Sequence, residues 1–130
     1  MLIASQLYDE LVAHARAELP NESCGMLAVD GERFTHFFAA RNEFASPMRF
    51  RIDSSDQIRI WNAIDKLGLE TSIFHSHPNS EASPSQTDRN LARDWPGAIW
   101  VICSLAEEEA VVRAFRITDG EVEELEFIVE

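Results

Sequence analysis

Residues 98–105 constrain the fold more than any other segment, because every residue except Ser104 is apolar. A run of strand length that is apolar at both alternating sets of positions predicts a strand at the centre of a sheet. Six further segments have the length and composition of strands: 23–29, 33–40, 48–52, 70–77, 110–117 and 122–129. We therefore expect six or seven strands, and Asp30-Gly31 and Asp119-Gly120 predict hairpin turns between them.

Three helices are expected between these strands, over about residues 5–19, 54–67 and 84–94. Ser5, Ser54 (in the capping box Ser54-x-x-Gln57) and Ser83 before Pro84 are the expected N-caps. The second helix is expected to bury four apolar side chains, Ile60, Trp61, Ile64 and Leu67, and to end at Gly68.

Strands and helices alternate along the chain, but several strands are joined as hairpins. This order predicts an α+β (mixed α/β) fold with a mixed or largely antiparallel sheet flanked by about three helices. The chain has 130 residues and shows no repeat, linker or low-complexity segment. We therefore expect a single domain that spans residues 1–130.

The formal charge of −12 excludes two classes of partner. A protein that binds nucleic acid needs a basic surface, and so does a protein that binds an anionic membrane. The N-terminus has no basic segment followed by a long apolar run, and no stretch approaches about 20 apolar residues. We expect a cytoplasmic protein in which Cys24 and Cys103 are buried free thiols, and the composition is compatible with a monomer or a homodimer.

Two histidines, His75 and His77, end the strand expected at 70–77. Because side chains alternate in a strand, both imidazoles leave the same face. Asp88 follows eleven residues after His77, near the start of the third helix. Two neutral imidazoles and one carboxylate are three ligands for a divalent metal, with a fourth position left for water, as in catalytic zinc sites.

Ser85 and Asp88 share a helix face, because they are three residues apart. Helix capping alone would also explain this pair, and it requires no metal. Glu22 precedes the first long apolar strand, where a carboxylate is well placed for an active site; the alternative is a solvated loop glutamate.

Together, Glu22, His75-x-His77, Ser85 and Asp88 resemble the JAMM motif of the MPN-domain metalloproteases. Every position of that motif is present, and a proline after the second histidine also fits. The order of helices and strands is similar to the MPN/JAMM (cytidine-deaminase-like) core over nearly the whole chain. The chain looks closest to the compact bacterial members, and its segments 46–47, 51–54 and 84–88 are similar to the Mec-like subgroup, which acts on ubiquitin-like sulfur carrier proteins.

The resemblance implies a zinc metallopeptidase with one Zn²⁺ ion held by His75, His77 and Asp88. It implies that Glu22 is the general base, which takes a proton from water and passes it to the leaving amine. It implies that Ser85 donates a hydrogen bond to the developing oxyanion. The implied reaction is hydrolysis of an amide bond at the C-terminus of a ubiquitin-like protein, with release of cysteine from a sulfur carrier protein.

Two alternatives remain open: a general isopeptidase for small ubiquitin-like modifiers, and a non-catalytic MPN interaction module. The presence of Glu22 and Ser85 disfavours the module, because a structural metal site needs neither. An extended substrate tail could pair with the strand expected at 48–52, where Arg49 and Arg51 would face solvent or the partner. An exposed edge strand protected by basic side chains explains these arginines equally well.

Overall fold

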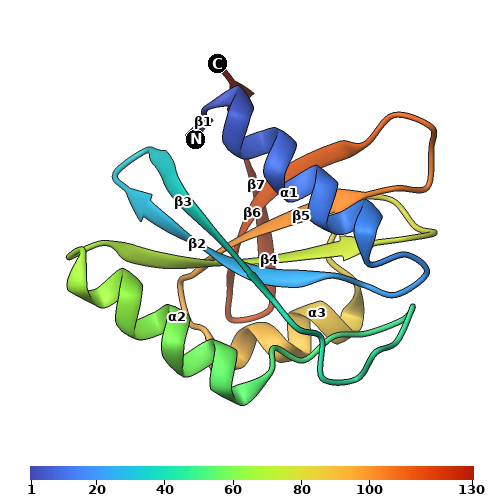
Figure 1. The fold of residues 1–130 in the computed structure, drawn as a ribbon, viewed down its shortest axis with the longest axis horizontal. Helices are drawn as coiled ribbons and strands as arrows, with labels where there is room; N and C mark the ends of the chain where they lie inside the picture. The colour runs from blue at the N-terminus through green and yellow to red at the C-terminus, as the bar shows by residue number, and fades with distance from the viewer.

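One curved sheet of eight strands organises the chain, in the order β7-β6-β5-β4-β2-β3-β1-β8 (Figure 1). The computed structural model describes all residues, 1–130. The strands are β1 (Leu2–Ile3), β2 (Cys24–Asp30), β3 (Arg33–Ala40), β4 (Glu70–His77), β5 (Ile99–Ser104), β6 (Val111–Thr118), β7 (Glu121–Leu125) and β8 (Ile128–Val129). The helices are α1 (Ser5–Ala17), α2 (Ser54–Lys66), α3 (Gln86–Leu91) and the 3₁₀ turn η1 (Ala92–Asp94).

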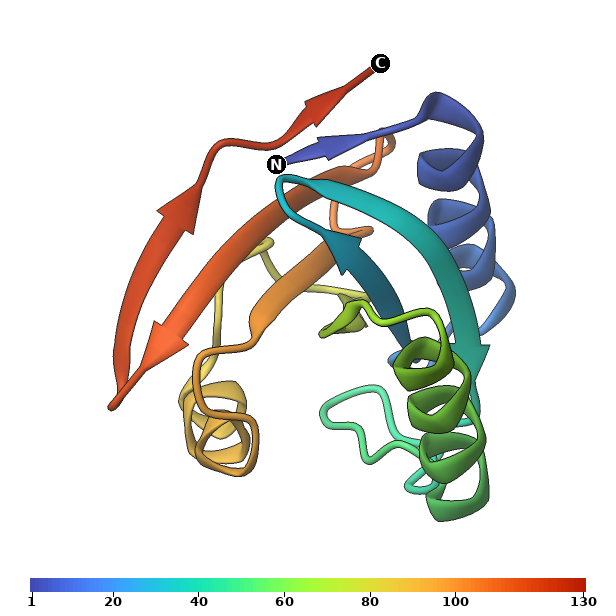
Figure 2. The same cartoon turned by 90° about the vertical axis from the view of Figure 1, so that its left-hand side faces the viewer.

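The two faces of the sheet are covered by different helices. Figure 2 shows α1 on one side of the sheet, and α2 and α3 on the other. The α1 side buries Leu11 and Ala15 against Leu27, Phe74 and Val101. The α2 side buries a second cluster, which includes Met26, Ile60, Ile64, Ile73 and Trp100. Burial of this kind contributes roughly 25 cal/mol per Å² of apolar surface, so both helix layers stabilise the sheet.

The central strands confirm the expected mixed sheet. All six residues of β5 are buried, as the apolar run predicts. β4 pairs parallel to β5 and antiparallel to β2. The parallel pair requires a crossover, and α3 with η1 lies in that connection.

Three expectations about strands were wrong. Residues 48–52 form no strand; their only ladder contact is the isolated bridge between Asn42 and Ile52. The segment 122–129 splits into β7 and β8, which lie at opposite ends of the sheet order. The additional strand β1 has only two residues and pairs parallel with both β3 and β8, so local sequence could not reveal it.

The helices form where expected, but the N-cap residue of each differs from the one that the sequence predicted. Ala4 precedes α1 and makes no side-chain cap, and Asp53 rather than Ser54 caps α2 by accepting from the Asp56 N–H. Ser85 rather than Ser83 caps α3. Trp61 and Leu67 are exposed rather than buried, because the helix turns them away from the sheet.

Cys24 and Cys103 are buried free thiols, as expected. Burial raises the pKa of each to about 12, so neither is a nucleophile near neutral pH. None of the helices has the length and hydropathy needed to cross a membrane.

Candidate metal and hydrolytic site

The C-terminal end of β4 and the first turn of α3 bring His75, His77 and Asp88 together. The β4 alternation places both imidazoles on the side of the sheet that α2 and α3 cover. Asp88 is held by a reciprocal capping box. Its N–H donates to Ser85 Oγ at 3.0 Å, and its Oδ2 accepts from the Ser85 N–H at 2.9 Å.

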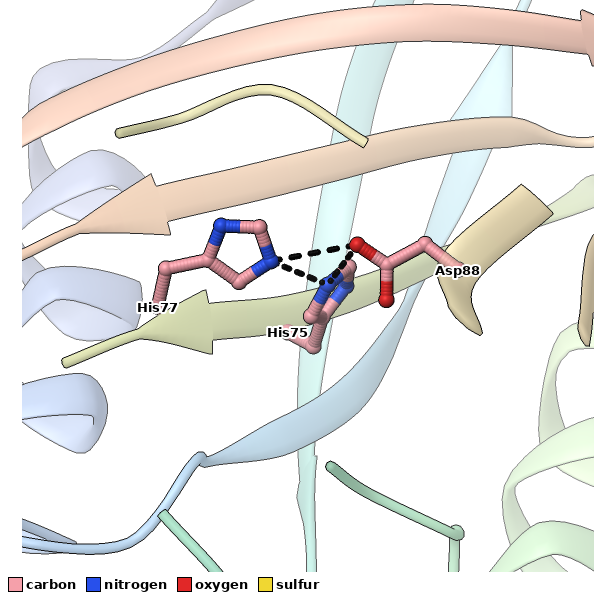
Figure 3. A group of neighbouring side chains, drawn as sticks. All are labelled: His75, His77 and Asp88. Carbon is pink, nitrogen blue, oxygen red and sulfur yellow. Dashed lines mark hydrogen bonds and ion pairs between the residues drawn. The ribbon is translucent and has the colours of Figure 1, made fainter. Parts of the chain in front are cut away.

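Three ligand atoms converge at this point (Figure 3). His75 Nε2 and His77 Nε2 are 3.1 Å apart, and each is 3.1 Å from Asp88 Oδ2. In a tetrahedral zinc site with bonds of about 2.0–2.1 Å, ligand atoms lie about 3.3 Å apart. Two nitrogens and one carboxylate oxygen at this spacing fit zinc in both chemistry and size.

The pKa shifts of His75 and Asp88 suit a metal site. Burial alone would lower the pKa of His77, but its contacts with Asp88 and the Glu81 carbonyl raise it. Burial lowers the pKa of His75, which favours the neutral imidazole. Burial alone would raise the pKa of Asp88, but the two imidazoles and the Ser85 N–H hold it well below its usual range. The cluster is therefore one anionic oxygen between two imidazoles, a donor set that a divalent cation stabilises.

A backbone carbonyl orients His77. Its Nδ1 lies 2.7 Å from the carbonyl oxygen of Glu81, which can only accept a hydrogen bond. Nδ1 must therefore carry a proton, and in the neutral form of the ring the Nε2 lone pair faces the cluster.

His75 is oriented by aromatic packing. Its ring stacks on Phe50, with centroids 4.5 Å apart and planes inclined by 20°, and meets the edge of Trp100 at 5.8 Å. Its Nδ1 is buried without a hydrogen-bond partner. Packing, rather than a hydrogen bond to Nδ1, fixes this ring.

Glu22 lies just before β2 and is buried, with 6% of its surface exposed. Its Oε1 has no hydrogen-bond partner. Burial raises its pKa to about 7, while the charge of His77 opposes the rise. A buried carboxylate without a partner is costly, so an uncompensated Glu22 indicates a functional rather than a structural role. The alternative considered for Glu22, a solvated loop glutamate, is wrong.

Ser85 is exposed at the N-terminus of α3. Its Oγ accepts the hydrogen bond from Asp88, so capping, the simpler explanation of this pair, is present. The hydroxyl proton has no acceptor within the protein and is free to donate outward. Capping and donation to a substrate are therefore compatible.

Asn42 is a site residue that the sequence reasoning missed. Its Nδ2 donates to the carbonyls of Glu22 and Arg49, both at 3.0 Å. Its Oδ1 accepts from the N–H groups of Phe44 at 3.1 Å and Arg51 at 3.0 Å. The amide thus closes the loop 43–51 and ties it to Glu22. An asparagine two residues after a strand, at the start of a long loop, was the only signal.

The same contacts explain why residues 48–52 form no free strand edge. Two backbone groups of this segment are already bonded to Asn42, and Phe50 and Ile52 are buried beneath it. Arg49 lies over the Phe44 ring at 4.2 Å, and Arg51 pairs with Glu43 at 3.3 Å. Residues 48–52 are therefore neither the candidate edge for a substrate tail nor an exposed edge strand protected by basic side chains.

An open groove of about 850 Å³ lies beside the site. It runs between α2 and η1 and is lined in part by Trp61, Trp95, Ile73 and Arg116. Phe50 lines one part of the groove and also packs on His75. The groove and the group of His75, His77 and Asp88 therefore share a wall.

Comparison with known proteins identifies the family. Residues 4–118 match the family of prokaryotic homologs of the JAB domain, Prok-JAB. The chain belongs to this family. The expected resemblance to JAMM/MPN proteins is thereby confirmed.

Two curated relatives of this JAB-domain protein cover nearly all of it. It is 36% identical over 128 residues to the CysO-cysteine peptidase of Mycobacterium tuberculosis, covering 95% of this chain and 87% of the relative. It is 34% identical over 136 residues to the desampylase of Haloferax volcanii, covering 98% and 95%.

Solved structures support the fold. A protein from Desulfitobacterium hafniense superposes with a TM-score of 0.87 at 35% identity, covering 100% of this chain and 93% of that one. A JAB1/MPN domain protein from Archaeoglobus fulgidus gives a TM-score of 0.65 at 18% identity, covering 99% and 98%. At that identity the likeness shows the fold alone.

Proposed function

We propose that this chain is a zinc-dependent JAMM peptidase that hydrolyses the terminal amide bond of a ubiquitin-like sulfur carrier protein and releases cysteine. The observation that carries the proposal is the convergence of three candidate ligand atoms at 3.1 Å. The buried, unpartnered carboxylate of Glu22 is near enough for the charges of His77 and Asp88 to shift its pKa. The relatives named CysO-cysteine peptidase support the substrate class.

His75, His77 and Asp88 are the proposed zinc ligands, and one ion fits between them. When bound, zinc supplies a Lewis acid that lowers the pKa of water toward about 7 and polarises a carbonyl. The carbonyl of Glu81 keeps His77 in the tautomer that a ligand requires.

Glu22 is the proposed general base. Its pKa of about 7 suits a group that must first accept a proton from water and then give it to the leaving amine. Ser85 has a free hydroxyl proton at the rim of the cluster, and it is the proposed donor to the oxyanion. The capping bonds hold that hydroxyl on the same turn as the ligand Asp88.

The family match to residues 4–118 supports a single catalytic domain. A reducing cytoplasm suits the two buried free thiols. A monomer and a homodimer both satisfy the proposal, because all the proposed site residues come from one chain.

A second candidate is an isopeptidase for small ubiquitin-like modifiers. The similar identity to the desampylase of Haloferax volcanii favours it. Both candidates use the same residues and differ only in the amine that leaves.

The test offers the zinc-loaded protein two substrates: a carrier protein extended by a C-terminal cysteine, and a lysine isopeptide conjugate of the same carrier. Mass spectrometry identifies the amide that is cut, and Glu22→Gln is the matched control that retains the ligands. We expect a carrier shortened by one residue, together with free cysteine. Cleavage of the isopeptide alone would favour the second candidate. If neither amide is cut by protein with stoichiometric zinc, both candidates are wrong.

A further inference from the structure

Two buried serine hydroxyls lie on the opposite side of the sheet from His75, His77 and Asp88. Ser76 lies between His75 and His77 on β4, and Ser23 follows Glu22 directly. Their exposed fractions are 0% and 1%. Because side chains alternate along β4, Ser76 points toward the α1 side while the histidines point toward α2.

The hydrogen bonds between the two serines replace part of the sheet ladder. The β2–β4 pairing ends at Cys24 opposite His75, and the Ser76 N–H still donates to the Ser23 carbonyl at 3.1 Å. The Ser23 N–H does not donate to a backbone carbonyl of β4. It donates to Ser76 Oγ at 2.8 Å, and the Ser23 hydroxyl lies 2.8 Å from the same oxygen. A side-chain acceptor therefore substitutes for a backbone acceptor where the strand ends.

This substitution fixes the peptide group that joins Glu22 to Ser23. Its N–H is bonded to Ser76, and its carbonyl accepts from Asn42 at 3.0 Å. The Glu22 N–H donates in turn to the carbonyl of Ser46 at 2.8 Å. The carboxylate itself has an oxygen with no partner, so its position depends on the backbone that carries it.

We propose that Ser76 is a positioning residue for Glu22. Its hydroxyl ties the peptide group after Glu22 to the strand that carries His75 and His77, and so sets the carboxylate at a fixed distance from the ligand atoms. Ser76 does not face the cluster and touches no substrate. The inference rests on the proposed function, in which Glu22 is the general base.

Ser72 provides a matched control on the same strand and face. It is also 0% exposed, four residues before Ser76, but its hydroxyl has no hydrogen-bond partner. Ser72→Ala removes a buried hydroxyl without breaking a hydrogen bond. Ser76→Ala removes the hydroxyl that accepts from Ser23.

The kinetic test compares the wild type with Ser76→Ala, Ser72→Ala, Glu22→Gln and the double variant Glu22→Gln/Ser76→Ala, each at confirmed zinc stoichiometry. A catalytic group displaced by about 1 Å costs up to about 10²-fold in rate. We expect Ser76→Ala to lower kcat by about 10- to 100-fold with KM within about threefold, and Ser72→Ala to change kcat by less than about twofold. In the Glu22→Gln background, Ser76→Ala should have almost no further effect, because the group it positions is gone.

Three kinetic outcomes would overturn the proposal. The first is an effect of Ser76→Ala no larger than that of Ser72→Ala. The second is an effect of unchanged size in the Glu22→Gln background, which would mean that Ser76 acts on the fold. The third is an effect explained by loss of zinc, which would mean that Ser76 acts on the ligands.

Amide hydrogen exchange tests the same contact without any turnover. We expect the protection factor of the Ser23 amide to fall by at least about tenfold in Ser76→Ala and to stay unchanged in Ser72→Ala. Equal protection in both variants would refute the positioning role even if the enzyme is active. A wild type that cleaves neither substrate would instead refute the proposed function, while the exchange data still report on the Ser76 contact.

Discussion

Glu22→Gln should stabilise the metal-free protein, and the gain should depend on pH. The substitution keeps the shape of the side chain and removes its charge. Burial raises the pKa of Glu22 from its ordinary value of 4.5 to about 7, because the ionised form loses water and finds no partner for Oε1. Each pKa unit corresponds to about 1.4 kcal/mol. The ionised carboxylate therefore costs the folded protein about 3 kcal/mol.

The sign follows from proton linkage. Between about pH 4.5 and pH 7 the folded protein retains a proton on Glu22 that the unfolded chain has released, so wild-type stability falls as the pH rises. Below this window the carboxyl is neutral in both states, and above it the full cost applies. The advantage of Glu22→Gln should accordingly grow by about 3 kcal/mol between pH 4 and pH 8.5.

Urea unfolding of chelator-treated wild type and Glu22→Gln at pH 4, 5.5, 7 and 8.5 measures this difference. All other titrating groups are common to both proteins, so most of their contribution cancels. A cost of about 3 kcal/mol is a large share of the 5–15 kcal/mol by which domains are stable, so it should be resolved easily. A difference that is constant with pH to within about 0.5 kcal/mol would show that Glu22 is not ionised in a buried environment.

Three further predictions concern the groups around Glu22. Asp88→Asn should abolish stoichiometric zinc in elemental analysis, and retained zinc would contradict the three-ligand assignment. It should also lower the free energy of unfolding of the metal-free protein near neutral pH, because the folded state stabilises the Asp88 carboxylate. Ser85→Gly should cost only a few tenths of a kcal/mol as an N-cap, yet lower kcat by about 10²-fold or more, and a fully active variant would exclude the oxyanion role. Asn42→Ala breaks four hydrogen bonds and should lower the free energy of unfolding by about 2–4 kcal/mol in urea; a loss below about 1 kcal/mol would show that other contacts hold the loop 43–51.

Sequence reasoning succeeded where the local pattern and the tertiary environment agree. The apolar run at 98–105 became the fully buried β5, and the spacing of His75 and His77 placed both on one face of β4. It failed where long-range pairing or side-chain capping decides. The segment 48–52 alternates as a strand should, but Asn42 takes its backbone groups and Phe50 packs on His75. The apolar stripe expected for α2 was too wide, because the curved sheet covers Ile60 and Ile64 but not Trp61.

The amino-acid sequence by itself predicted the proposed ligand set, His75, His77 and Asp88, because strand periodicity places both imidazoles on one face of β4. It also placed Glu22 directly before a strand, but that position did not distinguish a catalytic carboxylate from a solvated one. Only the tertiary structure decided that, by burying Glu22 without a partner and by fixing its peptide group with Ser76 and Asn42. The reason is that a pKa and a position depend on solvent exclusion and on hydrogen bonds between residues distant in sequence, and neither is encoded in local periodicity.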